Sequence, residues 1–321
     1  MGRNQSSFAR AAMKLLCTFL GIILAGMLLI TGRIMDMTGH RPELPGFLSS
    51  ASPLGSMLRD TQEEKILNIL LIGQDRREGE KQTRSDSMIL CSFNAREKQI
   101  VMTSFLRDLY LPIPGHGSNR INAAYALGGA PLLIETLEEN FDIRIDGSVQ
   151  VDFSQFSGIL DQLGGVTLEL RQDEAREINR ELGSSLSAGK QKLTGEQALA
   201  YARIRSLDPD GDFSRTDRQR KVLSALWDTY KDSSLTGLMK TMGSLLPMIE
   251  TDMGSGELLA AAVKVFPYLS EAEVISRRIP EADYCRDRVI DGMAVLEADM
   301  DTARRILHQG IYGESDGTTQ P

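Results

Sequence analysis

The pattern of apolar and charged positions separates a short N-terminal part from the rest of the chain. Residues 15–30, LLCTFLGIILAGMLLI, contain no charged side chain. With the small residues that follow, the apolar stretch is about 18–20 residues long, the length that a helix needs to cross a membrane. We therefore predict a transmembrane helix over residues 15–33.

The charges beside this stretch indicate its orientation. Arg3, Arg10 and Lys14 precede it, and Arg33 after it is soon followed by an aspartate. This bias favours a cytoplasmic N-terminus over residues 1–14 and an exported remainder. A cleaved signal peptide is the alternative. It is less favoured because the apolar run is longer than a signal core and lacks a good cleavage site after it.

Beyond the apolar stretch, residues 34–62 are rich in proline, glycine and serine, which predicts a linker. From there on, short apolar runs bounded by turn-forming residues predict strands. These runs are residues 66–73, 87–93, 99–105, 149–153, 165–170 and 273–279.

Segments with helical periodicity lie between and after the predicted strands. They cover residues 119–141, 154–164, 194–205, 214–231, 234–249, 256–267 and 297–309. The first is expected to be two helices joined at Gly128–Gly129, and Thr194 with Gln197 has the pattern of a capping box. Alternating strands and helices predict an α/β or α+β domain, which we place at residues 63–312, followed by a flexible tail at residues 313–321.

Composition narrows the classes of function. The formal net charge of −8 disfavours general nucleic-acid binding. The cysteines lack the spacing of metal ligands, and Cys91 and Cys285 are the only two that could pair outside the apolar stretch. The chain has no nucleophile elbow, P-loop or metalloprotease motif, and its few histidines offer little for a Ser–His–Asp or Cys–His mechanism.

Charged residues concentrate between the first two predicted strands. The segment at residues 73–87, GQDRREGEKQTRSDS, places Asp75 and Asp86 among arginines that include Arg77 and Arg84. A salt-bridged surface turn is one interpretation, in which each exposed ion pair contributes about 0–1 kcal/mol. A site for a metal ion and an anionic ligand is the other.

Further arginines favour the second interpretation. They are Arg107, the pair Arg203 and Arg205, and the group Arg215, Arg218 and Arg220. Arg215, Arg218 and Gln219 are expected to share one face of a helix. Guanidinium groups bind phosphate oxygens in a bidentate manner, and carboxylates suit Mg²⁺ bound together with phosphates. The whole set predicts a metal-assisted pyrophosphate site.

Several strings, in their order along the chain, resemble the LytR–CpsA–Psr family of bacterial cell-wall enzymes. They are NILLIGQDRR, RSDSMIL, SFLRDLYLPIPG, RINAAYALGG, VQVDFSQFSGILDQLGGV, LTGEQALAYARIR and DFSRTDRQRKVL, with a weaker match at GMAVLEAD. The resemblance implies a three-layer α/β/α domain with a central mixed sheet and a long apolar groove for a polyprenyl tail, preceded by one transmembrane helix.

The resemblance also implies an activity outside the membrane. The family transfers a phosphate-linked glycopolymer from undecaprenyl pyrophosphate to peptidoglycan, at the C6 hydroxyl of N-acetylmuramic acid. Teichoic acid, capsule and other wall polysaccharides all remain open as donors. The alternative is a polyprenyl-pyrophosphate hydrolase or a binding module without transfer activity. A regulator that binds nucleic acid is disfavoured by the acidic charge and by the lack of a DNA-binding motif.

Matching the family motifs implies roles for individual residues. Asp75 and Asp86 are the implied ligands of Mg²⁺, with Mn²⁺ as the alternative metal, and together with Arg107 they are the implied catalytic residues. We favour Asp75 over Asp86 as the general base. The implied pyrophosphate shell consists of Arg77, Arg84, Arg107, Arg203, Arg205, Arg215 and Gln219.

Some apolar residues are open to two interpretations, as the lining of the lipid groove or as ordinary core. We favour the core for all of them. They are Leu132, Leu133, Leu137, Phe156, Ile159 and Leu223.

Overall fold

The computed structural model describes only part of the chain. The described residues are 66–74, 85–205, 207–208, 211–230, 245, 248–254, 256–258, 261, 265, 268 and 271–313. The chain divides into two compact units, one of which comprises Ile66–Asp252 and Leu269–Pro321. In the other unit, the described residues include a turn in which the Gly254 N–H donates to the Glu257 carboxylate at 2.6 Å. The elements discussed below belong to the unit that comprises Ile66–Asp252 and Leu269–Pro321.

Several predictions concern segments that the structure does not describe. The predicted transmembrane helix at residues 15–33 and the linker at 34–62 lie outside the described residues, as do the predicted tail and the helices at 234–249 and 256–267 almost entirely. No helix within the described ranges is long and apolar enough to cross a membrane. The domain limits of 63–312 stay a prediction.

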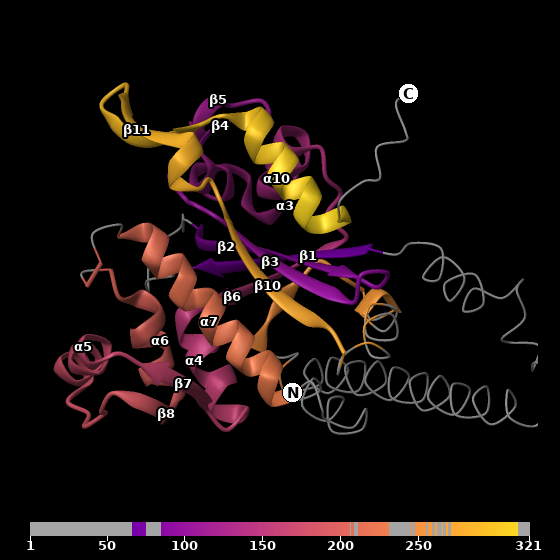
Figure 1. Cartoon of the computed structure of the whole chain (residues 1–321). Coiled ribbons are helices and arrows are strands. Elements are labelled where there is room, and N and C mark those ends of the chain that lie inside the picture. Colours follow the sequence, from indigo (N-terminus) through magenta and orange to yellow (C-terminus); the bar gives the residue numbers. More distant parts are fainter. Residues whose placement is uncertain are drawn as a thin grey trace, which may run out of the picture. The chain divides into compact units, whose positions relative to one another are not determined.

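A six-stranded mixed sheet forms the centre of the unit, with the order β10-β3-β2-β1-β6-β9 (Figure 1). The strands are β1 (Ile66–Gln74), β2 (Ser85–Asn94), β3 (Gln99–Phe105), β6 (Gly147–Asp152), β9 (Glu250–Thr251) and β10 (Glu273–Ile279). β1 pairs antiparallel with β2 and parallel with β6, while β3 pairs antiparallel with β2 and parallel with β10. The predicted α/β domain with a central mixed sheet is therefore confirmed.

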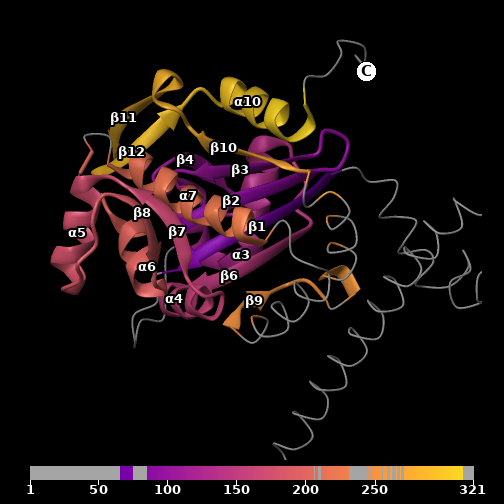
Figure 2. The same cartoon turned by 60° about the horizontal axis from the view of Figure 1, so that its bottom comes forward.

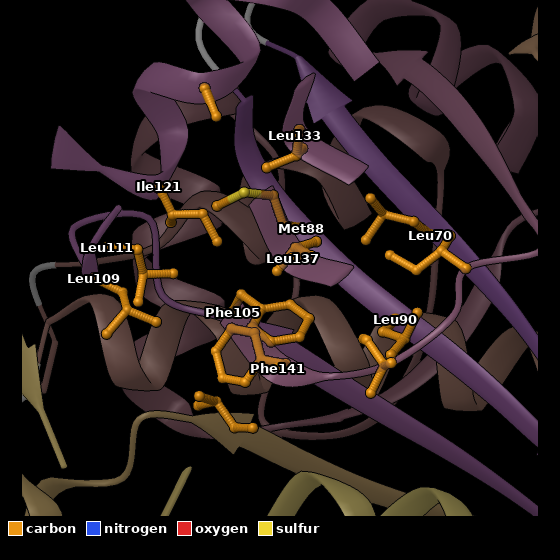
Figure 3. Close-up of a cluster of buried hydrophobic side chains, with 14 of the residues drawn as sticks. Leu70, Met88, Leu90, Phe105, Leu109, Leu111, Ile121, Leu133, Leu137 and Phe141 are labelled. Atoms are coloured by element: carbon orange, nitrogen blue, oxygen red, sulfur yellow. The ribbon is translucent and has the colours of Figure 1, made fainter. Parts of the chain in front are cut away.

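Two helices cover one face of this sheet, α3 (Ile121–Phe141) and α10 (Met300–Tyr312). Side chains alternate between the faces of a strand, so Leu70 and Leu90 meet α3 in a buried apolar cluster (Figure 3). Within the cluster the centroids of the Phe105 and Phe141 rings lie 5.1 Å apart. The backbone of α3 is non-helical at Gly128 and Gly129, which confirms the predicted junction.

Three helices cover the opposite face: α4 (Phe153–Gln162), α6 (Gly195–Arg203) and α7 (Asp212–Tyr230). Figure 2 shows α5 (Gln172–Leu182) farther from the sheet, beside α6. A hairpin of β7 (Val166–Leu170) and β8 (Gly189–Leu193) packs with these helices around a second apolar core. The helices thus form a layer on each side of the sheet.

Some elements differ from the sequence predictions. The strand predicted at residues 165–170 exists as β7, but it pairs with β8 and stays outside the central sheet. The last helix begins at Met300, because β12 (Met293–Ala298) continues to its start and pairs with β11 (Cys285–Ile290). The hairpin of β4 (Tyr110–Ile113) and β5 (Gly117–Arg120), together with η4 (Ala282–Tyr284), was not predicted. Cys91 and Cys285 are both free thiols.

Candidate functional site

An apolar cavity of about 210 Å³, here called the chamber, lies between the sheet and the helices α4, α6 and α7. Strand residues that point away from α3 form its floor, among them Leu71, Ile89 and Val149. Its helical walls are Phe153, Phe156, Ile159, Leu199, Ala202, Leu223 and Leu226. A chamber with these walls suits a ligand with a long apolar part.

The chamber bears on one sequence interpretation. Phe156, Ile159 and Leu223 line it, and Phe156 also packs against the second apolar core, so lining the chamber and belonging to the core are not exclusive. The other candidates lie on α3, across the sheet, where Leu133 and Leu137 are fully buried and Leu132 packs against them. Helical periodicity shows that a residue faces inward, but it does not show whether the space there is filled.

Two glycines allow the elements that form the chamber walls to pack closely against one another. A Cβ atom on Gly195 would lie 1.9 Å from the Ser157 carbonyl oxygen, so this glycine allows α6 to approach α4. A Cβ atom on Gly73 would lie 3.0 Å from the Ser87 Cβ atom, where β1 and β2 form one end of the chamber.

Polar residues border the chamber at this end. The Ser87 hydroxyl donates to Gln219 Oε1 at 3.0 Å, which ties α7 to β2. The Arg203 guanidinium at the end of α6 lies over the Phe153 ring, 4.7 Å from its centroid. Ser87, Gln219 and Arg203 all line the chamber. Two predicted pyrophosphate ligands, Arg203 and Gln219, therefore lie at the polar end of the apolar wall.

A network of guanidinium and carboxylate groups adjoins this border. Arg107, just after β3, donates from Nη1 to Asp86 Oδ1 at 3.0 Å, and its Nε lies 3.0 Å from Asp212 Oδ2. Arg215 Nη2 donates to Asp212 Oδ2 at 2.9 Å and to the Asp86 carbonyl at 3.1 Å. Arg205 Nε lies 3.8 Å from Asp212 Oδ1. We call these five residues the mouth network.

Arg107 and Arg215 are charged at neutral pH within the mouth network. Burial by itself would lower the pKa of Arg107, but the carboxylates of Asp212 and Asp86 outweigh it and raise that pKa above its ordinary value. Burial lowers the pKa of Arg215 to about 10, with Asp212 acting in the opposite direction. Both guanidinium groups are therefore cations when a phosphate group approaches, and they retain the bidentate geometry suited to it.

The structure brings together every predicted site residue that it describes. Asp86, Arg107, Arg205 and Arg215 belong to the mouth network, and Gln219 follows Arg215 by one turn of α7. Asp75, Arg77 and Arg84 lie outside the described residues.

The residues that flank this undescribed segment, Gln74 and Ser85, pair with each other in β1 and β2. Asp212, which contacts three of the arginines, was missed. It stands in a segment chosen for its arginines, and only the fold shows that it faces them.

Arg218 does not share the face of Arg215 and Gln219, so that prediction was wrong. Its side chain is 3% exposed and donates from Nε to Glu174 Oε1 at 3.0 Å. It also pairs with Asp208 and donates to the Ile204 carbonyl at 3.3 Å. Successive helical residues are rotated by about 100°, so positions i+3 and i+4 turn to opposite sides of position i.

The donor chemistry of the mouth fits one part of a divalent-cation site. Asp86 Oδ1 accepts from Arg107, and no described residue donates a hydrogen bond to Oδ2. Within the described residues there is no group of three or more His, Cys, Asp or Glu side chains that could hold a metal. Mg²⁺ usually takes one or two carboxylates together with waters and phosphate oxygens, so one described aspartate is compatible with it.

These features define a class of protein: an α/β domain with an apolar chamber on one face of its sheet and a cationic, carboxylate-bearing mouth. The model of the LytR_cpsA_psr family matches residues 49–311. The chain therefore belongs to the LytR–CpsA–Psr family, as the sequence motifs predicted.

Curated relatives agree with this assignment. "Regulatory protein MsrR" of Staphylococcus aureus (strain COL) is 34% identical over 217 residues, which are 67% of this chain and 64% of MsrR. "Polyisoprenyl-teichoic acid--peptidoglycan teichoic acid transferase TagT" of Bacillus subtilis (strain 168) is 36% identical over 219 residues, 65% of each chain. The chain thus spans slightly less than two thirds of the length of these relatives.

Solved structures show the same fold. The structure described as TagT bound to LIIa-WTA superposes with a TM-score of 0.63 at 30% identity, covering 78% of this chain and 92% of that one. The family protein YwtF (TagT) with bound octaprenyl pyrophosphate lipid superposes with a TM-score of 0.59 at 28% identity, covering 78% and 91%.

Proposed function

We propose that this protein transfers a phosphate-linked glycopolymer from undecaprenyl pyrophosphate to the C6 hydroxyl of N-acetylmuramic acid in peptidoglycan. The observation that supports it most is that Arg203 and Gln219 line the apolar chamber where it meets the mouth. A lipid pyrophosphate needs this combination, since its tail requires apolar walls and its head requires guanidinium groups. TagT, whose structures are described as bound to octaprenyl pyrophosphate lipid or to LIIa-WTA, supports the proposal by similarity.

The arginines are the proposed ligands of the pyrophosphate head. Arg107, Arg205 and Arg215 surround the carboxylate of Asp212, which holds three like charges together before a phosphate arrives. In a partly buried mouth these cations stabilise the negative charge that develops on the departing phosphate. Arg203, Arg77, Arg84 and Gln219 complete the proposed shell.

Asp86 and Asp75 are the proposed holders of Mg²⁺, with Mn²⁺ as the alternative. When bound, the cation would neutralise charge on the phosphate oxygens. Asp75 is the proposed general base, which takes the proton from the acceptor hydroxyl as the new phosphate ester forms.

The proposed setting is the outer face of the cell membrane. Residues 15–33 would anchor the chain with residues 1–14 in the cytoplasm, and residues 34–62 would connect the anchor to a catalytic domain at residues 63–312. The lipid-linked polymer, the membrane and peptidoglycan are the proposed partners, and no nucleic acid is among them.

A transfer assay tests the proposal. The full-length protein is incubated with a polyprenyl-pyrophosphate-linked saccharide, with and without peptidoglycan. Attachment of the saccharide to peptidoglycan is expected for the wild type and is expected to be lost in Asp75→Ala and Arg107→Ala. Arg176→Ala is the matched control, because Arg176 lies on α5 and bonds only its own helix at the Gln172 carbonyl among the described contacts.

The same assay separates transfer from the alternatives. Release of saccharide phosphate that does not depend on peptidoglycan would indicate a hydrolase, and binding without turnover would indicate a capturing module. Normal attachment by Asp75→Ala or Arg107→Ala, with both variants folded by circular dichroism, would contradict the assignment.

A further inference from the structure

Phe153 occupies a fixed position between the sheet and α4. It is the first residue of α4 and directly follows Asp152, which ends β6 and pairs with Gln74 of β1. The Asp152 carboxylate accepts from the Gln155 N–H at 2.7 Å, and Gln155 Oε1 accepts from the Asp152 N–H at 3.1 Å. This capping box holds the backbone on both sides of Phe153.

The Phe153 ring bridges the end of β1 and the end of α6. A Cβ atom on Gly73 would lie 3.8 Å from Phe153 Cε1, so the ring packs beside β1. The Arg203 guanidinium, on the last residue of α6, lies 4.7 Å from the ring centroid. Because Phe153 and Arg203 both line the chamber, the ring is an apolar wall that also carries a cation.

A ring places an arginine in a way that a carboxylate cannot. Asp212 holds Arg107 and Arg215 through negative charge, and that charge also repels an incoming phosphate. A cation–π contact restricts the guanidinium without adding an anion. Arg203 is an exposed residue at a helix end. Ordering a long side chain costs conformational entropy, and the ring contact offsets part of that cost.

We propose that Phe153 is a positioning residue for Arg203, and that it makes the chamber select polyprenyl pyrophosphates over uncharged polyprenols of the same length. The proposal rests on the proposed function, since it places the lipid tail in the chamber and the pyrophosphate at the mouth. It adds a residue that recognises the head group indirectly, through the arginine that it holds.

Phe156 provides a matched control for Phe153. It lies on the same helix and lines the same chamber, and none of the cation–π contacts among the described residues involves it. Phe156→Leu therefore reduces the apolar wall alone, whereas Phe153→Leu reduces the apolar wall and also removes the ring contact that positions Arg203.

The test measures equilibrium binding of octaprenyl pyrophosphate and octaprenol to the full-length protein in the same detergent. Phe153→Leu is expected to reduce the preference for the pyrophosphate about two- to fivefold, the range for a cation–π contact at an accessible site. Phe153→Met is expected to match it, Phe153→Tyr to restore the preference, and Phe156→Leu to weaken both ligands equally. In an Arg203→Ala background, Phe153→Leu is expected to leave the preference unchanged.

Several outcomes would overturn the proposal. They are an unchanged preference in both Phe153→Leu and Phe153→Met, a loss that tyrosine does not restore, or an undiminished effect of Phe153→Leu without Arg203. A wild-type protein that binds the pyrophosphate no better than the alcohol would overturn the proposed function together with this inference. A wild-type preference that persists without the ring overturns this inference alone.

Discussion

The Nε atom of Arg107 lies 3.0 Å from Oδ2 of Asp212, which joins the end of β3 to the start of α7. Asp212 Oδ2 also accepts from Arg215 at 2.9 Å, and Arg205 lies 3.8 Å from its other oxygen. One carboxylate therefore lies among three guanidinium groups that would otherwise repel one another. Asp212 acts as the counter-charge that allows a cationic mouth to form in a folded domain.

Asp212→Asn tests this role of the carboxylate. The side chain keeps its shape but loses its charge, and Arg215, whose side chain is 3% exposed, keeps its own charge without a full partner. We expect the free energy of unfolding to fall by about 1–3 kcal/mol, measured by urea denaturation. Asp301→Asn is the control, because the Asp301 side chain is 95% exposed beside Arg304 and its ion pair contributes about 1 kcal/mol at most. Equal stability of the two variants would contradict the role of Asp212.

Glu174→Gln tests how the segment that connects α6 to α7 is held in place. Glu174 lies on α5 and binds Arg218 of α7, which in turn contacts Ile204 in that segment. Glu174 and Arg218 form an ion pair at 3.0 Å with side chains 4% and 3% exposed, and Arg218 also holds the Ile204 carbonyl. Glu174→Gln removes one of the two carboxylates that compensate the buried Arg218 and leaves Asp208 as its remaining partner, so we expect a loss of about 1–3 kcal/mol in unfolding free energy. Arg171→Ala should cost about 1 kcal/mol or less, because that arginine is half-exposed.

A second measurement separates positioning from stability in this variant. The connection carries Arg205, so Glu174→Gln should also weaken binding of a polyprenyl pyrophosphate at temperatures where the variant is fully folded. Unchanged affinity there would show that the Glu174–Arg218 pair stabilises the fold without shaping the mouth.

The sequence predicted the elements whose physics is local. Every strand of the central sheet except the two-residue β9 was predicted from its apolar run, and the Thr194 capping box forms as expected. The hairpin of β11 and β12 was missed because β11, CRDRVI, is mostly charged and exposed. Such a strand carries no apolar alternation that would indicate a sheet.

The candidate site was also predictable only in part. The family motifs indicated Asp86, Arg107 and Arg215 from the sequence alone. Asp212 and Phe153 were not identified, because their roles depend on contacts between segments far apart in the chain. Helical spacing alone also placed Arg218 on the face of Arg215 and Gln219, and only the fold shows that Glu174 and Asp208 bind it.

Acid should unfold the domain partly through Asp208. A hydrogen bond from Arg171, which has the larger effect, and one from Arg218 lower the pKa of Asp208 below its ordinary value of 3.8. A carboxyl group with a lowered folded-state pKa contributes stability above its unfolded-state pKa, and that contribution disappears as the pH falls through the folded-state value. The stability difference between wild type and Asp208→Asn should therefore be largest above about pH 4 and shrink below it. Urea denaturation at pH 7 and at a series of lower pH values measures this, and a constant difference would contradict the linkage.

Gly195→Ala should separate the two helices that wall the chamber. The added methyl group would lie 1.9 Å from the Ser157 carbonyl oxygen and 3.0 Å from Asp161 Cγ, so α6 would have to move away from α4. That movement also breaks the bond from the Gly195 N–H to Asp161 Oδ1, which is 2.7 Å long. We expect a loss of about 3 kcal/mol or more in unfolding free energy, at the upper end of overpacking effects, and weaker binding of polyprenyl pyrophosphate.

Gly183→Ala is the matched control for this substitution. Gly183 ends α5 at φ +65° with no atom within 4 Å of an added Cβ, so its replacement costs only the strain of a left-handed conformation, about 1 kcal/mol. Urea denaturation of both variants compares a steric cost with a conformational one. If Gly195→Ala were no less stable than Gly183→Ala, the close approach of α4 and α6 would not be what holds the chamber walls together.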